Sequence, residues 1–146
     1  MIARVGIMLG LDFPCGAELE KIAMQSRSLF SYRPVMKDLN CCMSGLENQC
    51  RKFYQEEHMP ACDVAMFCLT AIAEILKAMT DAAIQQEQTS RILYAGGVMS
   101  DKYLQNQLKN YLKNKKLNPA FAEPACSCDN AAGTEIYAAM HDPDFA

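Results

Sequence analysis

A short apolar run followed by two glycines and a helical pattern is the feature of this sequence that most restricts its fold. Residues 92–95 (Ile-Leu-Tyr-Ala) form the run, Gly96 and Gly97 follow it, and the helical pattern begins at Ser100 or Asp101. Apolar runs bounded by glycine are typical of buried strands. Glycine allows a sharp turn, and the amides that open the next helix carry partial positive charge. The stretch therefore predicts an α/β protein whose turn either cradles a nucleotide or only reverses the chain.

A second strand and helix are predicted further along, at 119–123 and 129–140. The order strand–helix–strand–helix predicts a parallel pair with a right-handed crossover. The carboxyl ends of such strands share one rim, where ligands bind, so we expect Gly97 and Asp129 to lie on the same rim. Asp129 there either holds a divalent cation or only caps its helix. Asp101 has a similar alternative, as a first-turn acid stabilised by the helix dipole.

The rest of the chain is predicted to be mainly helical. Apolar residues recur at three- and four-residue intervals from 61 to 88, which predicts a long helix covered on more than one side. Ser44 and Glu47 fit a capping box at the start of another helix. The other expected elements are a helix around 5–9, a helix over 17–26, strands at 28–35 and 39–43, a helix over 44–54 and a helix over 100–114. Because parallel strands need cover on both faces, we expect further strands from a partner chain or a longer polypeptide.

Composition limits the class of protein. A length of 146 residues suits a single domain over 1–146. The formal charge of −3 gives no overall attraction for nucleic acid or acidic membrane. The lysines at 113, 115 and 116 either suit a helix C-terminus or form a local RNA patch. We expect no signal peptide, no membrane span and a cytoplasmic location. The 8 cysteines include no C-x-x-C pair, and the 2 histidines are not spaced with them as zinc ligands, so we expect reduced thiols.

Several motifs occur in the order of a known family. They are G-L-D-F-P-C-G at 10–16, M-S-G-L-E at 43–47, A-G-G-V-M-S-D at 95–101 and C-S-C-D-N-A-A at 126–132. Through these motifs the chain resembles the TsaD/Gcp family over nearly its whole length. The members of this family are tRNA threonylcarbamoyladenosine synthases, once known as O-sialoglycoprotein endopeptidases or glycoproteases. The resemblance implies the C-terminal portion of an ASKHA fold (actin, Hsp70 and sugar kinases; ribonuclease H-like), helix-rich with a small sheet. No zinc-peptidase motif or activated nucleophile supports the peptidase description.

The resemblance also implies a set of binding residues. Gly96, Gly97, Val98 and Asp101 match the family's G-G-V-x-x-N loop, which contacts the nucleoside part of the adenylate. Gly16 matches a family glycine at the same nucleoside. Asp129 matches the aspartate of C-T-D-N, a metal ligand. The implied ligands are ATP or threonylcarbamoyl-adenylate and a divalent metal, and no residue of this chain is implied to be catalytic.

Departures from the family pattern limit what this chain can do. Ala3 falls where the family has a substrate-binding aspartate, Asp101 replaces asparagine, and Glu47 replaces lysine. The metal-binding H-x-x-x-H pair and the S-G-G-H phosphate loop lie upstream in the family and are absent here. One carboxylate does not hold a catalytic metal tightly by itself.

Two functions therefore remain as expectations. In the first, the chain is a C-terminal fragment of a tRNA threonylcarbamoyl transferase, incomplete without the N-terminal part or a sister chain, and tRNA binds only to the intact enzyme. In the second, it is an inactive paralogue that binds nucleotide or protein partners. Both allow tRNA-modification partner proteins. We also expect homo-oligomers, because a truncated fold exposes apolar faces.

Overall fold

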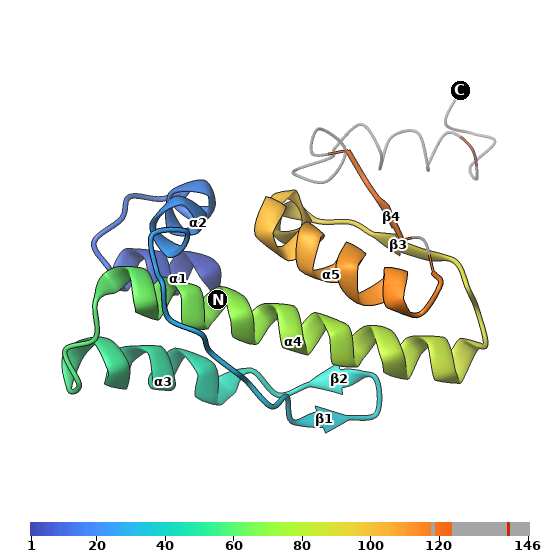
Figure 1. Cartoon of the computed structure of the whole chain (residues 1–146), viewed down its shortest axis with the longest axis horizontal. Coiled ribbons are helices and arrows are strands. Elements are labelled where there is room, and N and C mark those ends of the chain that lie inside the picture. The colour runs from blue at the N-terminus through green and yellow to red at the C-terminus, as the bar shows by residue number, and fades with distance from the viewer. Residues whose placement is uncertain (118, 124–139, 141–146) are drawn as a thin grey trace.

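A long central helix organises the structure, a computed structural model that describes residues 1–117, 119–123 and 140. This helix, α4 (Ala61–Glu87), extends along much of the molecule, and the other helices pack against it (Figure 1). Its buried side chains include Val64, Cys68, Ile72 and Ile75, which recur at three- and four-residue spacing. The helix ends at Gln88, which has a left-handed φ of 48°. The helix predicted over 61–88 is therefore confirmed.

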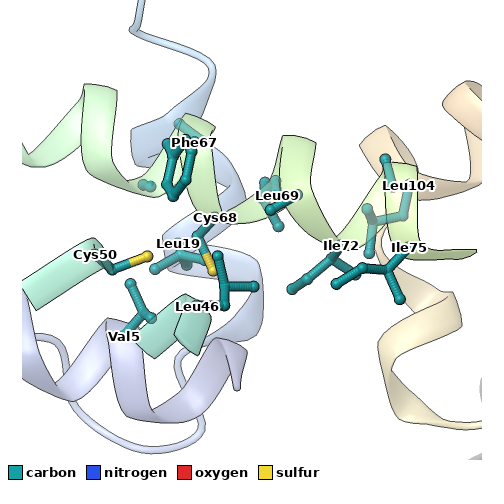
Figure 2. Close-up of a cluster of buried hydrophobic side chains, with 14 of the residues drawn as sticks. Val5, Leu19, Leu46, Cys50, Phe67, Cys68, Leu69, Ile72, Ile75 and Leu104 are labelled. Carbon is teal, nitrogen blue, oxygen red and sulfur yellow. The ribbon is translucent and has the colours of Figure 1, made fainter. Parts of the chain in front are cut away.

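Three shorter helices cover the first half of α4. They are α1 (Ile2–Met8), α2 (Gly16–Ala23) and α3 (Ser44–Gln55). Figure 2 shows their side chains meeting α4 in one apolar cluster, in which Val5, Leu19, Leu46, Cys50 and Cys68 are fully buried. Burying each leucine there stabilises the fold by about 1.5–3 kcal/mol. The three predicted helices are confirmed, with ends that differ by at most three residues.

The second half of α4 is covered by a parallel strand pair and its crossover helix. Strands β3 (Ile92–Tyr94) and β4 (Pro119–Phe121) pair in parallel, with Leu93 opposite Ala120. Helix α5 (Lys102–Asn114) connects them and buries Leu104, Leu108 and Leu112. This confirms the predicted strand–helix–strand order and the α/β character. The predicted last helix, over 129–140, falls almost entirely outside the described residues.

Of the other two expected strands, the one at 28–35 is wrong and the one at 39–43 is shortened to the two residues of β2 (Asn40–Cys41). In this region the structure has a hairpin of two antiparallel strands of two residues each, β1 (Met36–Lys37) and β2 (Asn40–Cys41). Residues 28–35 are irregular. The reason is aromatic packing. Phe30 and Tyr32 both place their rings edge-on against Phe67 of α4, with centroids 5.8 and 6.2 Å away. Contacts with a helix thus replace a strand ladder.

The predicted capping box at Ser44 is also absent. Helix α3 has no side-chain cap, and Glu47 does not reach back to the Ser44 amide. Its carboxylate instead accepts from Arg4 at 3.0 Å and from Arg51 at 3.2 Å. Hydrogen bonds between charged partners are stronger than a bond to a neutral amide. The Glu47 carboxylate therefore pairs with the two guanidinium groups and not with the backbone amide.

Two further expectations concern chemistry and location. Six of the cysteines lie in the described part of the chain, and all are free thiols: Cys15, Cys41, Cys42, Cys50, Cys62 and Cys68. Cys126 and Cys128 lie outside it. None of the described helices is both long enough and apolar enough to cross a bilayer.

Candidate functional site

The turn after β3 faces the start of α2 across a cavity of about 450 Å³. One wall comes from α1 and the loop that joins it to α2, and includes Ala3 and Phe13. The other wall comes from the 3₁₀ turn η1 (Gly97–Ser100) and from Asp101. Figure 1 shows α2 and the first turn of α5 next to each other above α4. The lining is mostly apolar, as in many small-molecule sites.

The two glycines of the turn have different tasks. Gly96 has φ +103°, a conformation that side chains rarely adopt, and its carbonyl accepts from the Met99 amide at 2.9 Å. It therefore shapes the turn, and it is not among the residues that line the cavity. Gly97 and Val98 do line the cavity. The sequence placed all three at a ligand, and the structure brings only the last two to the cavity.

Gly16 opens α2 on the opposite wall. A Cβ built at this position would first meet the side chain of Ile2, at 4.0 Å, which is ordinary contact. The protein's own packing therefore does not require glycine here. Because Ile2 also lines the cavity, a side chain at position 16 would take space from a bound molecule. Gly16 thus shares one cavity with Gly97 and Val98, which lie about eighty positions further along the chain.

Asp101 lines the cavity and also caps a helix. Its Oδ1 accepts from the Leu104 amide at 2.9 Å, so Asp101 is the N-cap of α5 and not the first-turn acid that the sequence pattern suggested. Its Oδ2 is buried and has no hydrogen-bond partner among the described residues. Burial is the main cause that raises the pKa of Asp101 from 3.8 to about 6, and the charge of Glu20 adds to it. The backbone amides of Leu104 and Tyr103 oppose this rise.

Glu20 places a second carboxylate at the same cavity. Its Oε1 accepts from the Tyr103 amide at 2.9 Å, which ties α2 to the first turn of α5. No lysine or arginine is found among the described residues that line the cavity. Two acids and apolar walls suit an uncharged ring or sugar with hydrogen-bond donors, whereas a phosphate would be repelled. The residues present fit the nucleoside end of a nucleotide.

Sequence reasoning missed Phe13 and Glu20, which also line the cavity. Glu20 is a charged residue within the helix predicted over 17–26, and a charged residue of a surface helix is most often solvent-exposed. Phe13 did carry a signal, since it is a large apolar residue between Gly10 and Pro14, where no helical or strand pattern assigns it to a core. An apolar side chain in a turn without periodicity is a candidate for ligand contact.

The residue assigned to a metal is Asp129. Asp129, and with it the expected meeting of the two turns at one rim, is outside the described residues. Within 1–117, 119–123 and 140, no three His, Cys, Asp or Glu side chains gather as a metal site would need. The described residues therefore do not provide a set of metal ligands.

Fold and cavity define a class of protein, an α/β protein with a small-molecule cavity beside a strand–Gly-Gly–helix turn. Comparison with known proteins identifies the family: the family model for TsaD, tRNA N6-adenosine threonylcarbamoyltransferase, matches residues 1–135. The chain belongs to this family, which confirms the resemblance found from the motifs.

Individual relatives agree with the family model. All three relatives described here carry the name tRNA N6-adenosine threonylcarbamoyltransferase. The protein of Streptococcus pneumoniae (strain Taiwan19F-14) is 26% identical to this chain and matches 95% of it. The protein of Acidovorax sp. (strain JS42) is 31% identical and matches 91% of the chain. The corresponding protein of Neorickettsia sennetsu is 28% identical over 88%. The matched region is only 43%, 40% and 42% of these relatives' own lengths. The chain thus spans about two fifths of the relatives it matches.

Proposed function

We propose that this chain is the C-terminal portion of a tRNA threonylcarbamoyltransferase with an ASKHA fold, and that it holds the nucleoside end of an ATP-derived adenylate. The observation that carries the proposal is the meeting of Gly16, Gly97, Val98 and Asp101 at one apolar cavity. Gly16 belongs to the motif at 10–16 and the other three residues to the motif at 95–101, so two segments that are distant in the sequence meet at this cavity.

Each residue has a defined task in this proposal. Gly16 and Gly97 leave room for the ligand, and Val98 offers it an apolar surface. Asp101 holds the first turn of α5 through Leu104, which fixes the wall behind the ligand. Asp101 and Glu20 keep phosphates away from this end, so they direct the charged part of a nucleotide outward. The bound adenylate would supply the activated threonylcarbamoyl group.

The chain on its own is incomplete in this proposal. The relatives are more than twice as long as the region matched here. The missing N-terminal part, or a sister chain, would bring the phosphate loop and the H-x-x-x-H metal ligands that the family carries upstream, and Asp129 would join them. tRNA and any partner proteins would bind to this larger assembly, with a cytoplasmic location.

Calorimetry with adenosine tests the nucleoside site. We expect the chain to bind adenosine more tightly than ATP, because the two acids oppose phosphate. Asp101→Asn should reduce the difference in affinity between adenosine and ATP, because it removes a negative charge from the cavity. The asparagine still has a side-chain oxygen that accepts from the Leu104 amide, so the helix cap is kept. Glu56→Gln, an exposed acid outside the cavity, is the matched control and should change neither affinity. Failure of the unaltered chain to bind adenosine would disprove the nucleoside site.

A second candidate is a catalytically inactive member of the family that serves as a nucleotide-binding or protein-interaction module. It is favoured by Ala3, which lines the cavity without the carboxylate of the family pattern, and by the acid at position 101. The two candidates differ in the transfer reaction. Threonylcarbamoyladenosine made when the chain is combined with an upstream TsaD part, ATP and tRNA supports the transferase, and adenosine binding without product supports the module.

A further inference from the structure

Phe13 stands apart from the other phenylalanines that the structure describes. Its side chain is 75% exposed, although it lines the cavity. Each of the others has an aromatic neighbour: Phe30 and Phe53 pack edge-on against Phe67, and Phe121 stacks on Tyr94 with ring centroids 5.2 Å apart. No aromatic ring among the described residues packs on Phe13, and it is outside the apolar core.

A second exposed apolar residue lies in the other wall of the same cavity. Val98 is 47% exposed and belongs to η1, whereas Phe13 belongs to the loop between α1 and α2. Exposed apolar side chains that gather at a concave site are typical of ligand contact, because their burial is completed only when the ligand arrives. The two walls therefore offer apolar surface from different elements to one occupant.

The chemistry of the cavity indicates what kind of group Phe13 takes. An aromatic face stacks on flat π systems, and every nucleobase has such a face. A ribose has no π system to stack, and a phosphate would place its charge near Glu20 and Asp101. Of the parts of a nucleotide, only the base can stack on the Phe13 ring and also contact the apolar wall beside it.

We propose that the ring of Phe13 stacks on the base of the bound nucleoside and that Val98 contacts the same base. This inference rests on the proposed nucleoside site and adds to it the residue that holds the base. Stacking does not read hydrogen-bond patterns, so Phe13 sets how tightly a base is held more than which base it is. The carboxylates hold the wall and oppose phosphate, which is a separate task.

A tryptophan reporter tests the stacking directly. The chain contains no tryptophan but 6 tyrosines, so the tryptophan emission of Phe13→Trp, excited at a wavelength that tyrosine does not absorb, comes from position 13 alone. We expect adenosine to quench this fluorescence and ribose to leave it unchanged. In calorimetry, Phe13→Ala should bind adenosine roughly tenfold more weakly. Phe13→Leu, which keeps apolar bulk but loses the ring, should also bind more weakly than the unaltered chain.

The control is Leu29→Ala, which truncates a fully exposed apolar residue that does not line the cavity. It should bind adenosine as the unaltered chain does. Equal adenosine affinity in the unaltered chain, Phe13→Ala and Phe13→Leu would overturn the stacking and leave the nucleoside site standing. No adenosine binding by the unaltered chain would overturn both. Circular dichroism of each variant distinguishes a lost contact from a lost fold.

Discussion

At the scale of single residues, Asp101 joins two demands that conflict. Its Oδ1 caps α5, while its Oδ2 is buried without a partner in the described part of the structure. An unpartnered buried carboxylate oxygen is unfavourable when charged. The same residue type that gives a good helix cap therefore lowers stability at neutral pH.

The pH dependence of stability follows from this conflict. The pKa of Asp101 is about 6 in the folded chain and near its ordinary 3.8 when unfolded, so the folded state binds more protons between these values. This residue's contribution to the free energy of unfolding should therefore rise as pH falls from 7 to 4 and decrease as pH rises through 6.

Urea unfolding of the unaltered chain and of Asp101→Asn, at pH 7 and at pH 5, isolates that contribution. The asparagine variant should be the more stable at pH 7, and its advantage should shrink at pH 5. Glu47 and the other acids titrate in both proteins, so their effects cancel in the difference. An advantage that is equal at the two pH values would show that Asp101 titrates normally.

At the scale of elements, α4 and α5 are held together by a row of leucines. Leu104, Leu108 and Leu112 are fully buried one helical turn apart. The contact is strengthened at its end by Asp81, which accepts from the Tyr111 hydroxyl and from Lys115 at 2.5 Å each. This partner for Lys115 agrees with a structural role for at least one of the lysines near the helix end.

Leu108→Ala should lower the free energy of unfolding by about 2–5 kcal/mol, because it leaves a cavity between two packed helices. Asn110→Ala, two positions away on the exposed side of α5, should change it by less than about 0.5 kcal/mol. Denaturant titrations of both variants provide the comparison. Similar losses in the two would mean that α5 does not depend on this row.

Elements with strong periodicity could be predicted from the sequence, and elements decided by tertiary contact could not. The stripe over 61–88 specifies α4 because every helical turn adds another apolar contact. Residues 28–35 have strand-like composition, but their rings pack on Phe67, which lies more than thirty positions away. No local pattern carries that information.

The same division applies to the candidate site. Gly97 could be placed at the turn from the strand–Gly-Gly–helix pattern, because such a turn restricts its residues strongly. Asp101 was assigned to a ligand only through the family resemblance, since the local pattern predicted a first-turn acid. For Phe13 the only local signal is an apolar residue in a turn without periodicity, and only the folded chain shows that its ring lacks the aromatic neighbours that the other described phenylalanines have. The tie between Glu20 and Tyr103 likewise depends on two segments that meet only after folding.

At the scale of the whole molecule, none of the other strands in the described part of the chain pairs with the free edge of the β3–β4 sheet. The only strand paired with β3 in the described chain is β4. Leu93 of β3 is 67% exposed and lines a second, largely apolar cavity of about 490 Å³ between β3 and the end of α4. Exposed strand edges with apolar side chains favour association.

We expect the chain to self-associate as its concentration rises, and Leu93→Lys to reduce this association by placing a charge at the strand edge. Light scattering across a concentration series measures the effect. Lys109→Ala, at an exposed position of α5, serves as the comparison. A monomer at high concentration would show that the edge is protected in some other way.

The hydrogen bond from the Tyr103 amide to Glu20 has a wider consequence. It links positions 83 residues apart at the cavity, where the N-terminal helices meet the crossover unit. A small molecule bound there would contact both regions at once and hold them together. Ligand binding would then raise the melting temperature of both regions together. A thermal unfolding measurement would therefore detect the ligand even if no reaction takes place.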